Sequence, residues 1–309
     1  MIWLGWRQQR TETVIAAAIL ALVAVILVPV GIEMAHAYTR DGLSHCLGAT
    51  QRPLCDELVG NFQQRFDKYN SLVGWFNLVP GLFGVALAGP FALELERGTH
   101  RLAWTQSITR RRWVATKLGL ATGSTLVASA VLIAILVWWR QPLVKLDGRM
   151  DNGAFDAQGT VILGYGLFAL GLALAIGALW RRAIPAAMVA FVGYFIARIF
   201  VDTWLRQRFI TPKTVTWPAG KDQPASLARS WVFTEYPSNA AGTKMQPVPR
   251  ACFSGTHAKC IVRPGFGYMH AVFEPASRFW ALQGIETAAF GVTGIALIAF
   301  AGWWTLHRE

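Results

Sequence analysis

Six long apolar runs, separated by polar segments, set the pattern of this chain. They lie at residues 13–34, 71–93, 113–139, 159–180, 185–205 and 279–306. A helix of about 20 apolar residues crosses the hydrocarbon core of a membrane, and each run is long enough for that. The pattern therefore predicts an all-α integral membrane protein with six transmembrane helices, forming a single six-span domain over residues 1–309.

Basic residues orient these spans. The segments expected on the cytosolic side hold eleven of them: Arg7, Arg10, Arg97, Arg101, Arg110, Arg111, Arg112, Lys117, Arg181, Arg182 and Arg308. Short cytosolic loops carry an excess of Lys and Arg. Long loops are translocated largely regardless of their charge, so the basic residues of segment 206–278 do not argue against an extracellular position. We therefore expect a multi-pass plasma-membrane protein with both termini in the cytosol. A cleaved signal peptide is the competing interpretation of the first run, but only Ala35-His36-Ala37 offers a weak cleavage-like site.

Composition agrees with a membrane protein and changes how the charge is interpreted. The chain is 54% hydrophobic, has 14 Trp and carries a net charge of +12. In a soluble protein this charge would indicate a nucleic-acid partner. Here most basic residues flank spans or lie in loops, and no nucleic-acid-binding motif is present. We therefore expect contact with membrane lipid and no nucleic acid.

The four cysteines all lie in the predicted extracellular segments, where disulfides persist. Cys46 and Cys55 share one loop, and Cys252 and Cys260 share another. A zinc site with neighbouring histidines is the alternative, but the spacings match no standard ligand pattern. Four cysteines allow three pairings, and we choose Cys46–Cys55 and Cys252–Cys260 because each pair lies within one loop. The proline-rich segment 206–278 is expected to form an extracellular cap of turns and short helices.

Motifs of enzyme chemistry are absent from the sequence. The chain has no GxxxxGK[ST] loop for ATP phosphates, no GxSxG and no HExxH. A membrane enzyme acting on lipids is also disfavoured, because no His/Asp/Glu constellation gathers at one membrane face. We expect no catalytic site, metal or cofactor in this chain.

A few polar residues interrupt the spans. Glu33 lies at the outer end of the first, Asn77 in the second and Glu286 in the outer half of the sixth. Carboxylates inside a membrane are costly and often functional, so these three are candidates for a substrate path. The alternatives are that Glu33 reaches the headgroup layer and that Glu286 pairs with Arg198. Arg198 and Asp202, four residues apart on one helix face, are predicted to pair with each other.

The stretch Glu94 to Lys117 is a polar interruption between the second and third spans. After Glu94 and Glu96, Gly98 can take the positive-φ turn that ends a helix, and the Thr99 hydroxyl can cap the next helix. Leu102 and Trp104 give that short helix an apolar side before Arg110 and its basic neighbours. The pattern predicts a helix lying flat at the cytosolic surface. An ordinary positively charged loop without a partner is the alternative.

The motif Glu96-x-Gly98-Thr99, followed by Ser107-x-Thr109-Arg110 and Lys117, resembles the loop between the second and third spans of ABC-2 type transporter permeases. The longer string GPFALELERGTHRLAWTQSITRRRW is similar to a subgroup common in high-GC Gram-positive bacteria. The resemblance implies a type V exporter-like fold in which residues 93–112 form a coupling segment. The residues expected to couple to an ATP-binding subunit are Glu94, Glu96, Gly98, Thr99, Leu102, Trp104 and Arg110.

The resemblance also implies an assembly. Two permease subunits, identical or similar, would form the path, and two separate ATP-binding subunits would carry the ATP and Mg. The expected direction is export, and the expected cargo is hydrophobic or amphipathic, such as an antibiotic, a lipid or a peptide. The runner-up is a membrane-embedded sensor or interaction protein with a ligand-binding cap and no ATPase partner. Co-purification of a P-loop ATPase would separate the two.

Overall fold

A computed structural model describes residues 2–46, 53–99, 109–150, 155–244 and 267–308 of the chain. Its long helices are α1 (Ile2–Arg40), α3 (Val79–Glu96), α5 (Arg110–Asp147), α7 (Val161–Trp180), α8 (Ala183–Phe200) and α10 (Phe279–Arg308). Helix α8 continues through a π turn (Val201–Leu205) into α9 (Arg206–Phe209). In the described residues six helical stretches are long and apolar enough to cross a membrane, which confirms the six predicted spans.

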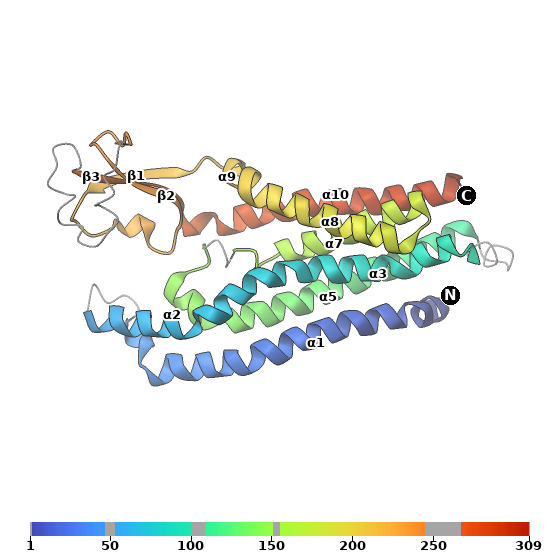
Figure 1. Cartoon of the computed structure of the whole chain (residues 1–309), viewed down its shortest axis with the longest axis horizontal. Helices are drawn as coiled ribbons and strands as arrows, with labels where there is room; N and C mark the ends of the chain where they lie inside the picture. Colours follow the sequence, from blue (N-terminus) through green and yellow to red (C-terminus); the bar gives the residue numbers. More distant parts are fainter. Residues whose placement is uncertain (1, 47–52, 100–108, 151–154, 245–266, 309) are drawn as a thin grey trace.

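Helix α7 is the centre of the bundle and packs against α3, α5, α8 and α10 (Figure 1). Its contact with α10 is made by glycines. A Cβ on Gly171 would lie 2.5 Å from the carbonyl oxygen of Gly294, so only glycine permits this approach. Small residues are the usual means by which membrane helices pack closely, because lipid tails compete with larger apolar side chains. The close contact fixes α7 and α10, which both contribute to the site described below.

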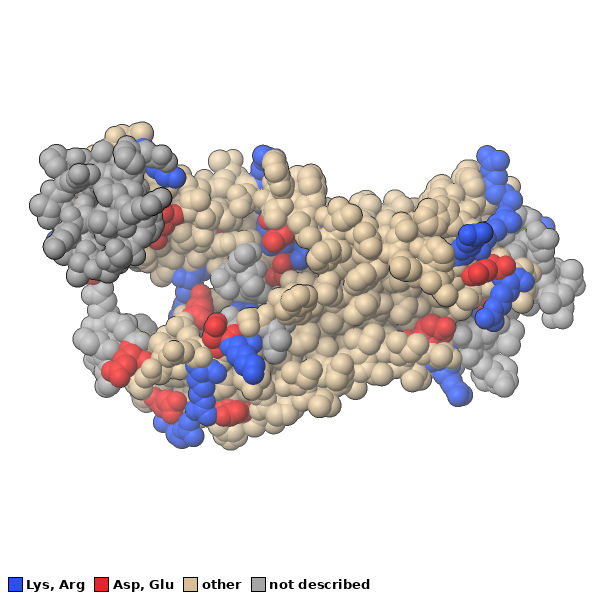
Figure 2. Space-filling view, viewed as in Figure 1, with Lys and Arg blue, Asp and Glu red and all other residues tan. Residues whose placement is uncertain are grey.

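The bundle has two distinct ends (Figure 1). Both chain termini and the two flanks of the segment between α3 and α5 lie at one end, called here the terminal end. The three β-strands and α2 (Pro53–Val73) lie at the other, called the sheet end. On the face seen in Figure 2, the charged side chains gather towards the two ends, and the surface next to the terminal end is a broad uncharged band. This distribution is the one expected of a bundle embedded in lipid.

The described part of segment 206–278 contains a β-sheet, which corrects the prediction of turns and short helices. Strands β1 (Lys213–Pro218), β2 (Trp231–Ser238) and β3 (Tyr268–Glu274) form an antiparallel sheet in the order β1-β3-β2. Pro218 and Pro237 argue against strands in the sequence, yet both lie on the outer strands. Proline is tolerated on an edge strand because no partner needs its missing N–H.

The predicted Cys46–Cys55 disulfide is confirmed. It joins a short 3-10 helix (Leu43–Cys46), which follows α1, to the start of α2, with a Cα–Cα distance of 5.5 Å. Cys252 and Cys260 lie outside the described residues, so their pairing stays a prediction. The bond closes a short loop at the sheet end and therefore restrains that loop more than the bundle.

Thiol labelling of the unreduced, denatured protein should leave Cys46 and Cys55 unmodified. We expect no reactive thiol if Cys252 and Cys260 also pair, and two if they do not. Cys46→Ser should expose one further thiol, on Cys55. Labelling of Cys46 and Cys55 in the unreduced wild-type protein would contradict the disulfide.

Candidate functional site

A cluster of buried charged side chains lies between α7, α8 and α10 near the sheet end. Its members are Asp156 in the loop before α7, Tyr165 on α7, Arg198 on α8, Arg206 on α9 and Glu286 on α10. Each is at most 7% exposed, and Tyr165 and Glu286 are 0% exposed. Asp202, in the π turn, joins them from a partly exposed position. We call these six residues the ionic network.

Arg206 is the most highly connected member of the network. Its Nε donates to Glu286 Oε2 at 2.9 Å, its Nη2 to Asp156 Oδ1 at 2.5 Å and its Nη1 to Asp202 Oδ1 at 2.5 Å. Its guanidinium carbon also lies 4.6 Å from the ring centroid of Phe155. One cation thus holds three carboxylates from three different parts of the chain. The planar fork of arginine suits this because it presents several donors in fixed directions.

Arg198 holds two of the same carboxylates from the other side. Its Nη2 lies 2.9 Å from Asp156 Oδ2 and its Nη1 lies 3.1 Å from Glu286 Oε1. Its guanidinium also lies over the ring of Tyr165, 3.9 Å from the centroid. The Tyr165 hydroxyl donates to Glu286 Oε1 at 2.5 Å. Every charge in the cluster therefore has an opposite partner, as a buried ion in a low-dielectric interior requires.

The predicted pair between Arg198 and Asp202 is wrong. Asp202 pairs with Arg206, also four residues away, while Arg198 pairs with Asp156 and Glu286. The Nη atoms of Arg198 are held by Asp156 and Glu286, which leaves Asp202 to Arg206. Asp202 lies in a π turn (Val201–Leu205), in which the amide of Arg206 donates to the carbonyl of Val201. Such turns occur often at functional sites.

The network carries one more carboxylate than guanidinium groups. Asp156, Asp202 and Glu286 oppose Arg198 and Arg206. Burial by itself raises the pKa of Asp156, but the charges of Arg198 and Arg206 outweigh it and hold the pKa below the usual range. The carboxyl is therefore ionised at neutral pH. In the described residues no three His, Cys, Asp or Glu side chains are placed to hold a metal ion, because guanidinium groups separate these carboxylates.

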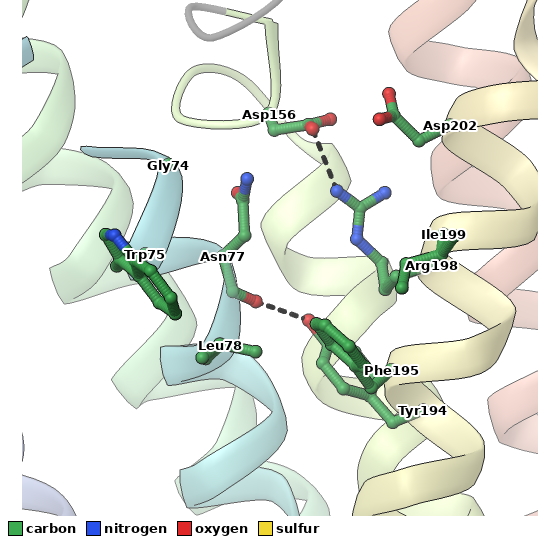
Figure 3. Close-up of a pocket in the computed structure, with 10 residues that line it drawn as sticks. All are labelled: Gly74, Trp75, Asn77, Leu78, Asp156, Tyr194, Phe195, Arg198, Ile199 and Asp202. Atoms are coloured by element: carbon green, nitrogen blue, oxygen red, sulfur yellow. Dashed lines mark hydrogen bonds and ion pairs between the residues drawn. The ribbon is translucent and has the colours of Figure 1, made fainter. Parts of the chain in front are cut away.

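A pocket of about 380 Å³ opens beside the network (Figure 3). It is lined by Gly74, Trp75, Asn77, Leu78, Asp156, Tyr194, Phe195, Arg198, Ile199 and Asp202. The first four come from a 3-10 turn (Gly74–Leu78) that leads into α3, and most of the rest come from α8. The Tyr194 hydroxyl donates to the Asn77 carbonyl at 2.7 Å and closes the floor between these two elements (Figure 3). The pocket thus has an ionic wall and aromatic and aliphatic walls.

The structure places two of the three predicted path residues on opposite sides of the wall between the pocket and the network. Asn77 lines the pocket, and Glu286 belongs to the network and faces the interior of the bundle. The alternative for Glu286, pairing with Arg198, is confirmed, and its place in a substrate path stays a prediction. Glu33 lies elsewhere: it pairs with Arg65 of α2 at 2.5 Å, and more than half of its side chain is exposed.

At the terminal end, the two predicted coupling carboxylates make contacts within the bundle. Glu94 pairs with Lys117 of α5 at 2.5 Å. Glu96 Oε2 accepts a hydrogen bond from the amide of Ala183, the first residue of α8, at 2.8 Å. Both flanks of the segment are thus attached to neighbouring helices.

The turn at the start of this segment is present: Gly98 has a φ of +68°. Arg110 is exposed and begins α5, which is capped by the hydroxyl of Thr109. Thr99 lies at the edge of the described residues, and Leu102 and Trp104 lie outside them. The helix that Thr99 would cap therefore stays a prediction.

Sequence reasoning missed three residues of the network, Asp156, Tyr165 and Arg206. Asp156 was placed in an extracellular loop and Arg206 at the start of the cap segment, yet both are buried. The spacing of Asp202 and Arg206 carried a signal for an ion pair. For Asp156 no local signal exists, because its arginine partners, Arg198 and Arg206, are 42 and 50 positions away.

Comparison with known proteins gives one match. The family model described as ABC-2 membrane transporter related matches residues 17–206. This range includes most of α1 and all of α3, α5, α7 and α8, together with five of the six network residues. No curated protein and no solved structure matches the chain.

Proposed function

The chain belongs to the ABC-2 membrane transporter related family, and we propose that it is the permease subunit of an ATP-driven exporter. The observation that carries this proposal is the ionic network beside the pocket, inside a six-helix membrane domain. Charged residues inside membrane segments are costly, and they usually mark a substrate or ion path.

The pocket suggests which cargo the path accepts. Asp156, Arg198 and Asp202 offer charged and hydrogen-bonding groups, while Trp75 and Phe195 offer exposed aromatic surface. A molecule with one polar end and one apolar end matches both walls. We therefore infer a hydrophobic or amphipathic cargo, such as a lipid, a peptide or an antibiotic, and export as the direction.

Energy would come from partner subunits. We infer two copies of a P-loop ATP-binding subunit, which carry the ATP and Mg, acting on two permease subunits. The proposed docking element is the segment 93–112, with Leu102 and Trp104 as apolar anchors, since large aromatics are common interface hot spots.

Helix α8 offers a route from this segment to the pocket. The carboxylate of Glu96 bonds the first amide of α8, and Arg198 lies on the same helix 15 residues later, about 22 Å along the axis. A displacement of the segment would move α8 as a rigid rod. Such a movement would separate Arg198 from Asp156 and Glu286 or bring them together, which changes the charge presented to the pocket.

Deletion of the gene in the organism that makes this protein tests the export function. Amphipathic compounds in cells and medium are compared by untargeted mass spectrometry between wild type, deletion and restored strains. We expect at least one amphipathic compound to shift from the medium to the cells on deletion and to return on restoration. An unchanged distribution in all three strains would contradict the proposal.

Gly98→Val should weaken the hold of the permease on its ATPase by about tenfold. The left-handed backbone at Gly98 disfavours a branched side chain. A Cβ there would have no described atom within 4 Å, so we attribute the effect to the backbone. Gly98→Asn is the matched control, because asparagine tolerates this conformation. Trp104→Ala should act like Gly98→Val by removing the anchor. If both variants co-purify as much ATPase as the wild-type permease does, this segment is an ordinary loop without a docking role.

A further inference from the structure

A groove of about 630 Å³ lies between α5 and α10 and shares no lining residue with the pocket of the ionic network. It is lined by Ile133, Val137, Gln141, Val144, Lys145, Arg149, Gln158, Gly159, Thr160, Phe279 and Trp280. The residues on α5 recur about every four positions, so they form one stripe along that helix. The groove runs from the middle of the span towards the sheet end.

The groove changes from apolar to basic along its length. Ile133 and Val137 line the inner part, and Lys145 follows Ile133 by twelve residues, about 18 Å along the helix. One leaflet contributes about half of the roughly 30 Å hydrocarbon core, so this distance matches the depth of one leaflet. At the sheet end the guanidinium of Arg149 lies 6.0 Å from the ring centroid of Trp280. Trp280 is 59% exposed, as expected of an aromatic residue at the headgroup level.

The end of the groove near the sheet carries two positive side chains that could bind an anion. Lys145 and Arg149 are exposed, and neither forms a salt bridge with a described carboxylate. Among the described residues, no Asp or Glu lines the groove. The nearby Asp147 instead accepts a hydrogen bond from Gln63 of α2 at 2.6 Å. Both cations thus line the groove, the ammonium of Lys145 lying 5.2 Å from the ring centroid of Tyr38, and no described carboxylate on the groove wall opposes them.

A second observation, independent of these charges, points to a ligand. Gln158 lines the groove and is only 4% exposed, yet its Nε2 has no hydrogen-bond acceptor within the described residues. A buried amide donor left unsatisfied costs about 1–3 kcal/mol, so such groups normally have a partner. The phosphate or ester oxygen of a bound molecule would supply it.

We propose that this groove binds one anionic phospholipid from the leaflet on the sheet side. Its phosphate lies between Lys145 and Arg149, Gln158 donates to a headgroup or ester oxygen, and one acyl chain follows Ile133 and Val137. The two cations select an anionic headgroup, and the apolar stripe selects a lipid over a soluble phosphate. The inference does not depend on the transport function proposed above.

Native mass spectrometry of the purified protein tests this, with phosphatidylglycerol and phosphatidylcholine of the same acyl chains as probes. Wild type should retain phosphatidylglycerol and little phosphatidylcholine. Lys145→Ala with Arg149→Ala should reduce phosphatidylglycerol retention about tenfold or more, because charge-assisted contacts are lost. The control is Lys68→Ala with Arg208→Ala, which removes the same charge from exposed residues outside the groove and should leave retention unchanged.

The apolar part is tested without a change of charge. Val137→Trp should fill the groove and lower phosphatidylglycerol retention, whereas Val127→Trp, on an exposed position of α5 outside the groove, should not. Glycerol 3-phosphate should not compete with the lipid. Equal retention by both double variants, equal binding of the two lipids by wild type, or displacement by glycerol 3-phosphate would each overturn the proposal.

Discussion

Replacement of Arg206 by leucine should lower the free energy of unfolding by about 3–5 kcal/mol, the cost of leaving buried charges without their partner. Arg206 contacts three carboxylates, from Asp156, Asp202 and Glu286, and its side chain is 1% exposed. Without it only Arg198 opposes three negative charges. Thermal unfolding of the purified variant in detergent measures the effect as a fall in the melting temperature.

Arg208→Leu is the matched control. Arg208 lies two residues further along α9 and is exposed, so the same substitution should change stability little. Arg206→Leu combined with Glu286→Gln should recover part of the loss, since one positive and one negative charge are then removed together. If Arg206→Leu and Arg208→Leu unfold at the same temperature, the network does not stabilise the bundle.

Glu286→Gln should reduce export about tenfold or more while the protein still reaches the membrane. Glutamine keeps the shape of the side chain and an acceptor for Tyr165. It also removes the charge that the network holds in excess, so stability should change much less than in Arg206→Leu. Glu286 does not line the pocket itself, but it pairs with Arg198, which does, so the substitution changes the charge balance behind the ionic wall. Export is measured as the fraction, in the medium, of the compound found by the deletion comparison, normalised to the amount of protein in the membrane.

Glu33→Gln is the control for that experiment. It makes the same chemical change in an exposed ion pair with Arg65, outside the pocket, and exposed ion pairs contribute little. Export by Glu33→Gln should equal that of wild type. If Glu286→Gln exports the compound normally, the network stabilises the fold and has no role in transport.

The spans were predictable from sequence because hydropathy acts locally. The hydrophobicity of each run of about 20 apolar residues is enough by itself to favour a position in the membrane, whatever the neighbouring segments are. The Cys46–Cys55 bond was predictable for a similar reason, since both cysteines lie in one short loop. The interior position of Glu286 followed from the cost of exposing a carboxylate to hydrocarbon.

The network was less predictable because its partners meet only in three dimensions. From the sequence, Asp156 is predicted to be an exposed loop residue. In the structure it is buried by side chains from α8, α9 and α10. The π turn at Val201–Leu205, which contains Asp202, is a small backbone irregularity without a clear sequence signature. The sheet was hidden by Pro218 and Pro237, whose effect depends on whether a strand is at the edge, a property of the fold and not of the strand.

The central claim, that this chain is a permease driven by a separate ATPase, is tested most directly by the mass of the complex it forms. The affinity-tagged chain is purified in mild detergent from the organism that makes it, and native mass spectrometry gives the subunits and their numbers. We expect two copies of this chain, or one copy with a similar permease, together with two copies of a subunit that carries a GxxxxGK[ST] loop. An intact, folded chain that purifies alone, or only with proteins lacking that loop, would contradict the claim and favour a membrane sensor.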